Sequence, residues 1–510
     1  MAFLTSFSGW LPVTFLSSQN IPPPSSTCRT SAPDQVKNVA QTPYHGPHQP
    51  HASQSRPQST YSLAEVLSVS RIHPFYSDAL YPPDEDTVQA IRKQAKTYLT
   101  EADLKKQPLL RKKDLYTVIE RLVNDTSPRN TYRHNVYTSV TGGGSTTSKP
   151  LFFATNALEN RRHRAYFGQM LQSLGVVKCG DWALTIHCAG ELYRSLDLTC
   201  EIMENAGASI LAAGNCLNPS KVVQLLQDFS VNILMGDGNQ VISVIHHIST
   251  ISPGKHNIKL DKIIYTSEGL TAAQRSHIHT ILGPVKICSF LGSAEAGPYG
   301  VSSPDLTPGD PTSNHADFII DTRMTLIEIL PISFKEGDPI PDTLPEGEIG
   351  IIAQTSLTRL RNPVVRYLTG DIGSLHSLPE RAQHLIAEAD RQYMRVLRLQ
   401  GRDRRFSFLW DGYDIEFEKL STVMAEPEFG VLQWQVVLDK MEPSKEISLE
   451  LRILTSRCHG HEPVIGRLKG FFGISSSNKH KFKVTLVNGV TDFELSQTGR
   501  KVIKLVDRCN

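Results

Sequence analysis

The sequence predicts an α/β protein with a large N-terminal domain and a small, mobile α+β domain at the C-terminus. Helical and strand-like apolar segments alternate from about residue 160 to residue 293, and β-type segments follow residue 310. Mixed helix and strand patterns occupy the residues after 400. Alternation of this kind is typical of mostly parallel sheets with helices on their faces, to which a β subdomain is added here.

The composition favours a globular protein that acts on a small molecule. The chain has 510 residues, 39% hydrophobic and 20% charged, which is enough for two or three packed domains. Its 53 basic and 51 acidic residues nearly balance, so it has no global attraction for nucleic acid or an anionic membrane. No apolar run approaches the roughly 20 residues of a membrane span. Eight scattered cysteines without a C-x-x-C pair are typical of reduced thiols, and we expect a cytoplasmic protein.

The N-terminal part changes character near Tyr61. Residues 1–60 are rich in Pro, Ser, Gln and Thr, and we expect disorder because so little apolar surface can be buried there. Helical spacing then appears in 63–72, 86–99 and 114–123. We predict that the large domain covers residues 61–400.

Helices and strands alternate through the large domain. Helices are predicted at 160–176, 196–208 and 220–229, with strands at 181–189, 209–214 and 231–237, and the same alternation continues through 240–249, 259–269, 271–283 and 284–293. The segments 317–333 and 346–357 have β character. We place a domain boundary at Gly401–Arg402, so that a small lid domain covers 401–510, with a helix at 417–425 and strands at 434–440, 447–454 and 480–487.

The stretch VTGGGSTTSKP at 140–150 has the composition of a phosphate-binding loop. A Walker-type P-loop is excluded because Pro150 stands where the Mg²⁺-binding hydroxyl belongs, and proline offers neither a hydroxyl nor a backbone N–H. A flexible turn is one alternative. The other is a loop whose amides and hydroxyls wrap the β- and γ-phosphates of ATP, with Lys149 as a point charge. The motifs further along the chain favour the second alternative.

Those motifs carry a resemblance to a known family. The chain resembles the acyl-CoA synthetase, adenylation-domain and luciferase superfamily, and within it the phenylacetate–CoA ligase-like branch. The resemblance covers roughly residues 61–507. The segments that carry it are HPFY at 73–76, QPLLRKKDL at 107–115, STTSKP at 145–150, SFLGSAEAGP at 289–298, EGEIG at 346–350, PVVRYLTGD at 363–371 and LQGRDRR at 399–405.

The resemblance implies a two-step reaction of a small carboxylic acid, aryl or related. The acid attacks the α-phosphorus of ATP, pyrophosphate leaves, and a thiol, most often that of coenzyme A, then displaces AMP. Mg²⁺ is the implied cofactor and a homodimer a possible assembly. Two alternatives stay open: transfer of the acyl group to an amine or carrier-protein thiol, and a catalytically impaired homologue that serves as a binding module.

The resemblance also implies roles for particular residues. Glu295 would bind Mg²⁺, Asp371 the ribose hydroxyls, and Arg402 the ribose or α-phosphate. Lys501 would be the adenylation lysine, and Lys149 a second catalytic cation. The implied ATP-binding residues are Gly143, Gly144, Ser145, Thr146, Thr147, Ser148, Lys149, Glu268, Gly292, Ala294, Asp371 and Arg402. The structural alternatives are a surface carboxylate for Glu295, a turn for Ser267–Gly269 and Asp371, and an ion pair for Arg402.

Several family positions are changed in this sequence. Serine replaces two loop glycines, leucine an adenine-stacking aromatic, alanine a hydroxyl residue, and arginine two hinge aspartates, at Ser145, Ser148, Leu291, Ala294, Arg404 and Arg405. The charged positions are retained, so we expect an active but divergent ligase. Aromatic and imidazole side chains that could line an acyl pocket are those of Tyr166, Phe167, His187 and Tyr193.

Overall fold

A computed structural model describes residues 60–97, 103–140, 152–190, 192–251, 258–267, 269–307, 315–335, 338–402, 407–456, 460–496 and 501–509. Contacts between Cα atoms group Pro57–Asn510 into one compact unit. The N-terminal segment predicted to be disordered lies outside the described residues apart from Thr60, and so does the glycine-rich loop after Val140.

The helices predicted from apolar spacing are present. Capping residues define several of their first turns: the side chains of Ser62 and Glu65 form a capping box, and Asn218 and Thr271 each accept a hydrogen bond from a backbone N–H. The helices up to residue 282 are α1 (Leu63–Ser70), α2 (Glu85–Thr97), α3 (Lys112–Asn124), α4 (Ala157–Ser173), α5 (Ser195–Asn205), α6 (Pro219–Asp228), α7 (Gly238–Thr250) and α8 (Ala272–Leu282).

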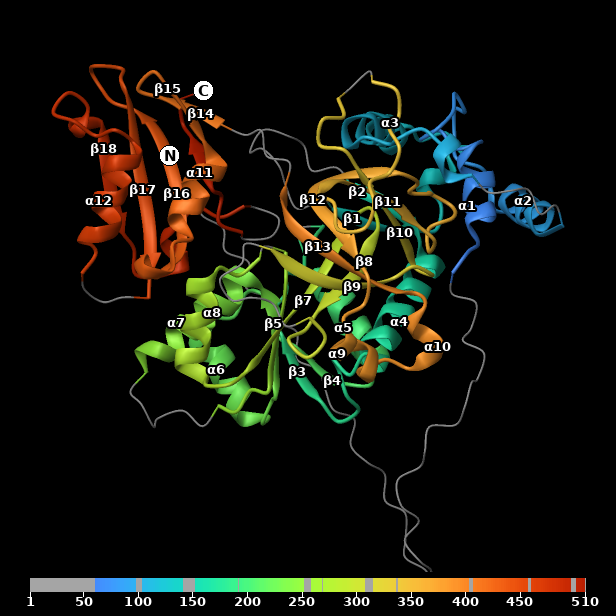
Figure 1. The fold of residues 1–510 in the computed structure, drawn as a ribbon, viewed down its shortest axis with the longest axis horizontal. Coiled ribbons are helices and arrows are strands. Elements are labelled where there is room, and N and C mark those ends of the chain that lie inside the picture. The colour runs from blue at the N-terminus through green and yellow to red at the C-terminus, as the bar shows by residue number, and fades with distance from the viewer. Residues whose placement is uncertain are drawn as a thin grey trace, which may run out of the picture. The chain divides into compact units, whose positions relative to one another are not determined.

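One mixed sheet of eleven strands forms the centre of the large domain (Figure 1). Its order is β10-β11-β12-β13-β9-β8-β7-β6-β5-β3-β4. Strands β3 to β7 pair in parallel, whereas β7 to β13 pair antiparallel. The predicted parallel and β-rich parts are therefore continuous. The strands are β3 (Trp182–Thr185), β4 (Ser209–Ala212), β5 (Ile233–Asp237), β6 (Lys262–Thr266), β7 (Lys286–Ser293), β8 (Gly297–Ser302), β9 (Ala316–Asp321), β10 (Thr325–Leu330), β11 (Gly350–Ser356), β12 (Tyr367–His376) and β13 (Met394–Arg402).

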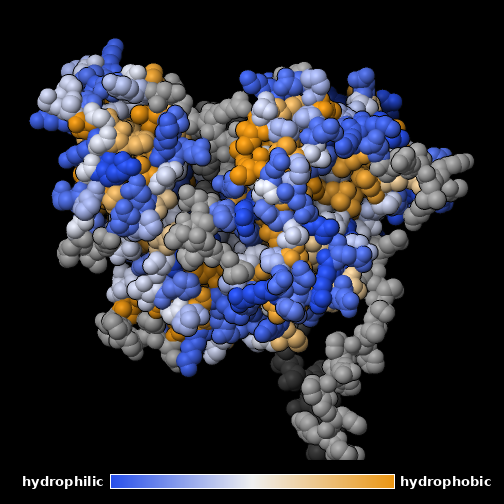
Figure 2. Space-filling model, viewed as in Figure 1, coloured by the Kyte–Doolittle hydropathy of each residue, from blue (hydrophilic) through white to orange (hydrophobic). Residues whose placement is uncertain are grey.

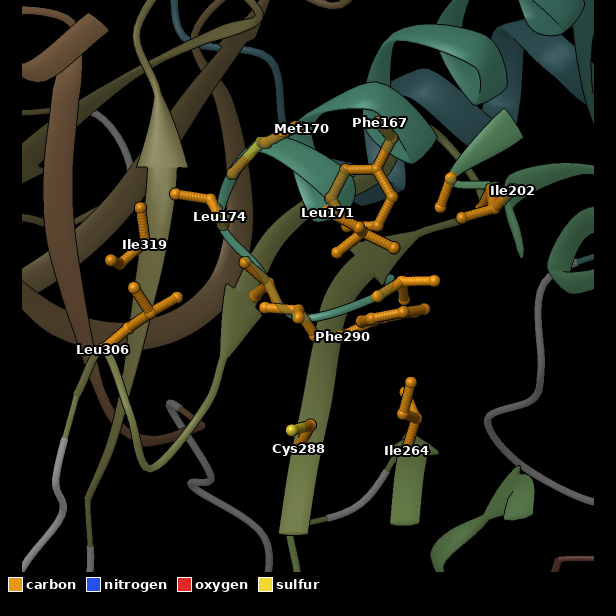
Figure 3. Close-up of a cluster of buried hydrophobic side chains, with 14 of the residues drawn as sticks. Phe167, Met170, Leu171, Leu174, Ile202, Ile264, Cys288, Phe290, Leu306 and Ile319 are labelled. Carbon is orange, nitrogen blue, oxygen red and sulfur yellow. The ribbon is translucent and has the colours of Figure 1, made fainter. Parts of the chain in front are cut away.

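Helices cover both faces of the parallel half because successive strand residues point to opposite sides. Met235 and Ile264 pack with α4 and α5, while their neighbours Leu234 and Ile263 pack with α6, α7 and α8. Figure 3 shows the first of these cores, in which Phe167 of α4 meets Phe290 of β7 edge-on, with ring centroids 5.3 Å apart. The α/β class is confirmed.

The glycine-rich loop joins two strands of a separate hairpin. Strands β1 (Val136–Val140) and β2 (Phe152–Asn156) pair antiparallel, and Val140 with Phe152 is the pair next to the loop. Two short helices, α9 (Glu380–Leu385) and α10 (Glu388–Arg391), lie between β12 and β13 in sequence.

The residues after 406 form the predicted α+β arrangement. A four-stranded sheet of order β18-β17-β16-β19 has its own core, in which Trp410 and Phe472 pack edge-on. The boundary at Gly401–Arg402 stays a prediction. The elements are β14 (Ser407–Trp410), β15 (Tyr413–Glu416), α11 (Phe417–Met424), β16 (Val431–Lys440), β17 (Ile447–Thr455), α12 (Glu462–Phe471), β18 (Phe482–Leu486) and β19 (Leu505–Asp507).

The described surface mixes polar and apolar residues, as the face drawn in Figure 2 shows. Among the described residues, no helix has the length and apolar character needed to cross a lipid bilayer.

Candidate functional site

Polar side chains gather where three neighbouring parallel strands end. His187 follows β3 by two residues, Asp237 ends β5 and Thr266 ends β6. Because β3, β5 and β6 are adjacent and parallel, their carboxyl ends lie at the same edge of the sheet. Open α/β sheets bind their ligands at that edge. We call His187, Asp237, Thr266 and Ser267 the strand-end cluster.

A directed chain of hydrogen bonds links the strand-end cluster. Thr266 donates from Oγ1 to Oδ1 of Asp237 at 3.1 Å, and its oxygen lies 3.0 Å from Nε2 of His187. A hydroxyl that gives its proton to a carboxylate can only accept from the imidazole, so Nε2 of His187 carries the proton. Thr185 then donates to Nδ1 of His187 at 2.8 Å.

The charge of Lys501, the predicted adenylation lysine, reaches this cluster. Burial lowers the pKa of His187, and the Lys501 charge lowers it further while Asp237 opposes both. Burial raises the pKa of Tyr193, which Lys501 again moves down and Asp237 up. The backbone of Lys501 is fixed by Ser496, whose N–H donates to the Lys501 carbonyl at 2.7 Å. The Lys501 charge is thus close enough to act on two residues that follow β3.

Glu295, the predicted Mg²⁺ ligand, lies in the turn between β7 and β8. Its side chain is buried and its Oε1 accepts hydrogen bonds from the hydroxyls of Tyr116 at 2.9 Å and Tyr367 at 3.1 Å. Lys112 Nζ is 3.9 Å from the same oxygen. The interpretation of Glu295 as a plain surface carboxylate is wrong, because only 3% of the residue is exposed.

Two buried side chains, those of His163 and Arg359, pack against the Glu295 turn. His163 lies 2.8 Å from the carbonyl of Pro298 through Nε2 and 2.8 Å from Thr358 through Nδ1. Gly297 has φ +75°, and a Cβ there would lie within 3 Å of both His163 and Arg359. Only glycine fits this position without displacing the two side chains. The conformation of the turn is therefore fixed by residues of α4 and of the segment after β11.

Gly292 and Ala294, two of the predicted ATP-binding residues, frame the same turn. A Cβ on Gly292 would lie 2.7 Å from the Cα of Pro298 and 2.8 Å from the carbonyl of Gly297, so the two strands approach too closely for a side chain. The register between β7 and β8 shifts at this point. Ala294 is half-buried beside Glu295.

Asp371 and Arg402 meet at the end of the β12–β13 ladder. Their backbones pair in register, and the N–H of Asp371 donates to the hydroxyl oxygen of Thr369 at 3.1 Å. The charge of Asp371 adds to burial in raising the pKa of Tyr299 and of Tyr367, which bonds Glu295. Asp371 is therefore close to the Glu295 turn. Only the backbone of Arg402 is described.

The remaining predicted residues lie outside the part of the chain that the structure describes: Glu268 and the loop positions Gly143, Gly144, Ser145, Thr146, Thr147, Ser148 and Lys149, together with the changed positions Arg404 and Arg405. Their roles stay predictions.

A magnesium ion fits the donor set at Glu295 in one respect. Within the described residues no three His, Cys, Asp or Glu side chains are grouped for metal binding. Mg²⁺ does not need such a group, because it is commonly held by one or two carboxylates together with substrate phosphates. A single buried carboxylate is compatible with that mode of binding.

The sequence did not predict several residues that contact the candidate site. Tyr116, Tyr367, Asp237 and Thr266 carried no family motif role, although the last two end apolar strands where ligand-binding residues collect. Of the four side chains that could line an acyl pocket, those of His187 and Tyr193 lie near the Lys501 charge, and their role stays a prediction. Tyr166 and Phe167 instead lie in the large core, where Tyr166 donates to Asp321 at 2.9 Å and Phe167 packs on Phe290.

Two hollows in the described surface contain none of the predicted site residues. One of about 310 Å³ is lined by Ser377, Leu378, Gln383, Arg391, Gln392, Met394 and Arg395. The other, of about 130 Å³, lies between α2 and α4 and includes Tyr61, Glu85, Arg92, Glu159 and Arg361. Neither lies at the carboxyl ends of the parallel strands, so the strand-end cluster and the Glu295 turn remain the candidate site on chemical grounds.

Comparison with known proteins gives one related sequence and several related structures. No protein-family model matches the chain. Over 187 residues it is 28% identical to the phenylacetate-coenzyme A ligase of Pseudomonas putida, a match that covers 36% of this chain and 37% of that relative. The aligned part is thus little more than a third of the relative's length.

Structures of 2-hydroxyisobutyryl-CoA ligase are similar over most of the chain. One in the postadenylation state, in complex with R3-HIB-AMP, has a TM-score of 0.60 at 16% identity and covers 91% of this chain and 94% of its own. Another, with 2-HIB-AMP and CoA in the thioesterification state, has a TM-score of 0.52 at 16% identity and covers 91% and 95%. At this identity the likeness shows a common fold.

Proposed function

We propose that this chain, a divergent member of the adenylate-forming superfamily with the fold of its acid–CoA ligases, activates a carboxylic acid with ATP and transfers the acyl group to a thiol. In the first step a carboxylate oxygen bonds the α-phosphorus and pyrophosphate leaves. In the second a thiolate attacks the acyl carbon and AMP leaves. Coenzyme A is the proposed thiol, since the relative described above is a phenylacetate-coenzyme A ligase and the two structures described above are of 2-hydroxyisobutyryl-CoA ligase.

The observation that supports this proposal most is the position of Lys501. Its charge acts on His187 and Tyr193 at the carboxyl ends of the parallel strands, where open α/β sheets bind ligands. Adenylation is catalysed by positioning and by stabilising negative charge, and an ammonium group at that edge supplies such stabilisation. Lys501 would orient the acid and the α-phosphate for attack.

Carboxylates on neighbouring segments would hold the nucleotide. Glu295, fixed by two phenol hydroxyls, would bind Mg²⁺, which when bound neutralises charge on the ATP phosphates. Asp371 would accept hydrogen bonds from the ribose hydroxyls. Arg402, Glu268, Gly292, Ala294 and the loop 143–149 are the other proposed ATP contacts. The lid role of residues 401–510, the homodimer and the aryl nature of the acid stay predictions.

ATP–pyrophosphate exchange with a broad panel of acids tests the proposal. We expect at least one acid to support exchange in the presence of Mg²⁺, and addition of coenzyme A to yield AMP and a thioester. A folded protein that binds no ATP and supports exchange with no acid would favour the binding-module alternative. Exchange followed by product only with amines, or only with a carrier thiol, would identify a different acceptor.

A further inference from the structure

Asp237 is a buried carboxylate that caps the N-terminus of α7, where its side chain and that of Gln240 form a capping box, and one of its oxygens has no hydrogen-bond partner in the part of the chain that the structure describes. Only 4% of the residue is exposed. Oδ1 accepts two hydroxyl protons, from Thr266 at 3.1 Å and from Ser267 at 2.6 Å. Oδ2 is closed off from solvent and has no hydrogen-bond partner among the described residues. An unsatisfied buried acceptor costs about 1–3 kcal/mol, and more when it is charged.

A second buried aspartate at the opposite ends of the same strands shows what a purely structural carboxylate looks like. Asp181 precedes β3 and is 7% exposed. Its Oδ1 accepts from Asn232 at 3.0 Å, and its Oδ2 accepts from the ammonium of Lys262 at 2.7 Å and the N–H of Lys178 at 2.8 Å. Both oxygens are satisfied and the charge is paired. Asp237 is similarly buried, but its charge faces the N-terminus of α7 instead of a lysine.

His187 does not supply the missing partner. Its two ring nitrogens contact the hydroxyls of Thr185 and Thr266, not the Asp237 carboxylate, and burial lowers its pKa. Ser267, which donates to Asp237, is exposed and adopts φ +78°, a conformation that is uncommon for a residue other than glycine. Such strain collects at ligand-binding positions. The Asp237 carboxylate therefore lies just beneath an exposed, strained residue at the ligand-binding edge of the sheet.

We propose that Asp237 binds a protonated amino group of the acid substrate, so that the acid is an amino acid in the broad sense. The inference rests on the proposed function, because it names the substrate of that site. The charge of Asp237 raises, and that of Lys501 lowers, the pKa of the same two side chains, those of His187 and Tyr193. A zwitterion matches this pattern, with its carboxylate near the lysine and its ammonium at Oδ2. A buried carboxylate selects strongly for a cation, since it otherwise stays unpaired.

Matched acids test the proposal with the wild-type protein. Pyrophosphate exchange is measured for matched pairs: phenylalanine against 3-phenylpropanoate, in which hydrogen replaces the amine, and β-alanine against butanoate and 6-aminohexanoate against heptanoate, in which a methyl group replaces it. At the correct spacing the amino member should be at least about 30-fold better in kcat/KM. N-acetylation, which removes the charge, should abolish the advantage. A hydroxy acid that outperforms the matching amino acid overturns the assignment of a cation.

Two variants locate the effect. Asp237→Asn keeps the size of the side chain but removes its charge, and should reduce the preference for the amino member by a factor of about 30 or more. Asp181→Asn is the matched control: it removes an equally buried carboxylate, and should lower thermal stability without changing the preference. Circular dichroism verifies that both variants fold. If Asp237→Asn does not fold, the wild-type comparison with the N-acetylated acids decides.

The outcomes separate this inference from the function on which it rests. Exchange with no acid of any kind means that the proposed function is wrong. Exchange only with acids that lack an amine leaves the function standing and overturns the substrate class. A preference for amino acids that Asp237→Asn leaves unchanged removes Asp237 as the residue responsible.

Discussion

Tyr367 donates a hydrogen bond from its hydroxyl to Oε1 of Glu295 at 3.1 Å, and each residue is only 3% exposed. Burial and the neighbouring carboxylate raise the pKa of Tyr367, so the phenol stays protonated and remains a donor. Tyr116 supplies a second donor to the same oxygen. The orientation of the carboxylate is thus set by two side chains from α3 and β12.

Removing one of these donors should destabilise the fold. Tyr367→Phe leaves the ring in place but takes one donor from a buried carboxylate, and we expect the free energy of unfolding in urea to fall by about 1.5–3 kcal/mol. Tyr413→Phe is the control, because Tyr413 is 68% exposed, and it should change stability by less than about 0.5 kcal/mol. Equal stability of the two variants would mean that the bond to Glu295 contributes nothing.

Glu295→Gln should weaken the response to magnesium. Glutamine keeps an acceptor for the tyrosines but lacks the charge that a hard cation requires. We expect the Mg²⁺ concentration at half-maximal pyrophosphate exchange to rise about tenfold or more. Glu416→Gln, at an exposed residue paired with Lys419, should leave the titration unchanged. An unaltered titration in Glu295→Gln would show that this carboxylate is not the ligand.

Lys501→Ala should slow adenylation much more than thioester formation from supplied acyl-adenylate. Loss of a charge-assisted hydrogen bond of about 1.5–3 kcal/mol corresponds to roughly 10- to 150-fold in exchange rate. Lys504→Ala is the comparison three residues on; the Lys504 ammonium lies 4.6 Å from the ring centroid of Trp434. If Lys504→Ala causes the loss instead, the adenylation lysine is Lys504.

The effect of Lys501→Ala can also be measured without an activity assay, through the pKa of His187. The Lys501 charge lowers the pKa of His187, so its removal should raise that pKa, while burial still holds it below the ordinary value. An NMR titration of the imidazole measures this shift. An unchanged pKa would mean that Lys501 does not approach the strand-end cluster in solution.

His73 makes stability depend on pH. The fully buried ring contacts Asn362 at 3.1 Å, and burial lowers its pKa from 6.5 to about 3. Between these values the unfolded chain binds the proton and the folded protein does not, so stability falls as pH falls below 6.5. From pH 6.5 to 5 this residue should lower the free energy of unfolding by about 1.6 kcal/mol.

A variant isolates that contribution. His73→Gln keeps a polar side chain beside Asn362 but cannot titrate, so its unfolding free energy should depend less steeply on pH in this window. Urea unfolding of both proteins at pH 7, 6 and 5 gives the difference. Parallel pH profiles would exclude His73 as a contributor.

The local elements were predictable because their signals are local. The apolar face of α3, with Leu115, Ile119 and Leu122, is spaced for a helix and is buried as one face. The pairing of β13 with β9 was not, because antiparallel pairing between strands far apart in the chain depends on how whole segments pack. A single mixed sheet therefore emerges only in three dimensions.

The candidate site, too, was predictable from the sequence only in part. The family resemblance implied roles for Glu295, Asp371 and Lys501 from their positions along the chain, and these roles stay predictions. The resemblance said nothing about which oxygen of a carboxylate is occupied, since that depends on side-chain torsions and on partners such as Thr266 and Tyr116. The unpaired oxygen of Asp237 is a property of packing, and no spacing in the sequence encodes it.

The bracing of the Glu295 turn limits how this protein can vary in evolution. His163 contacts both Pro298 and Thr358, and the space beside it admits no side chain at Gly297. A change at His163 removes the partner of the buried Pro298 carbonyl and of the Thr358 hydroxyl, and a side chain at Gly297 would collide with His163, so the cost of each change depends on what stands at the other positions. Viable relatives should replace His163 and its contacts together, as a set of epistatic substitutions, rather than one at a time.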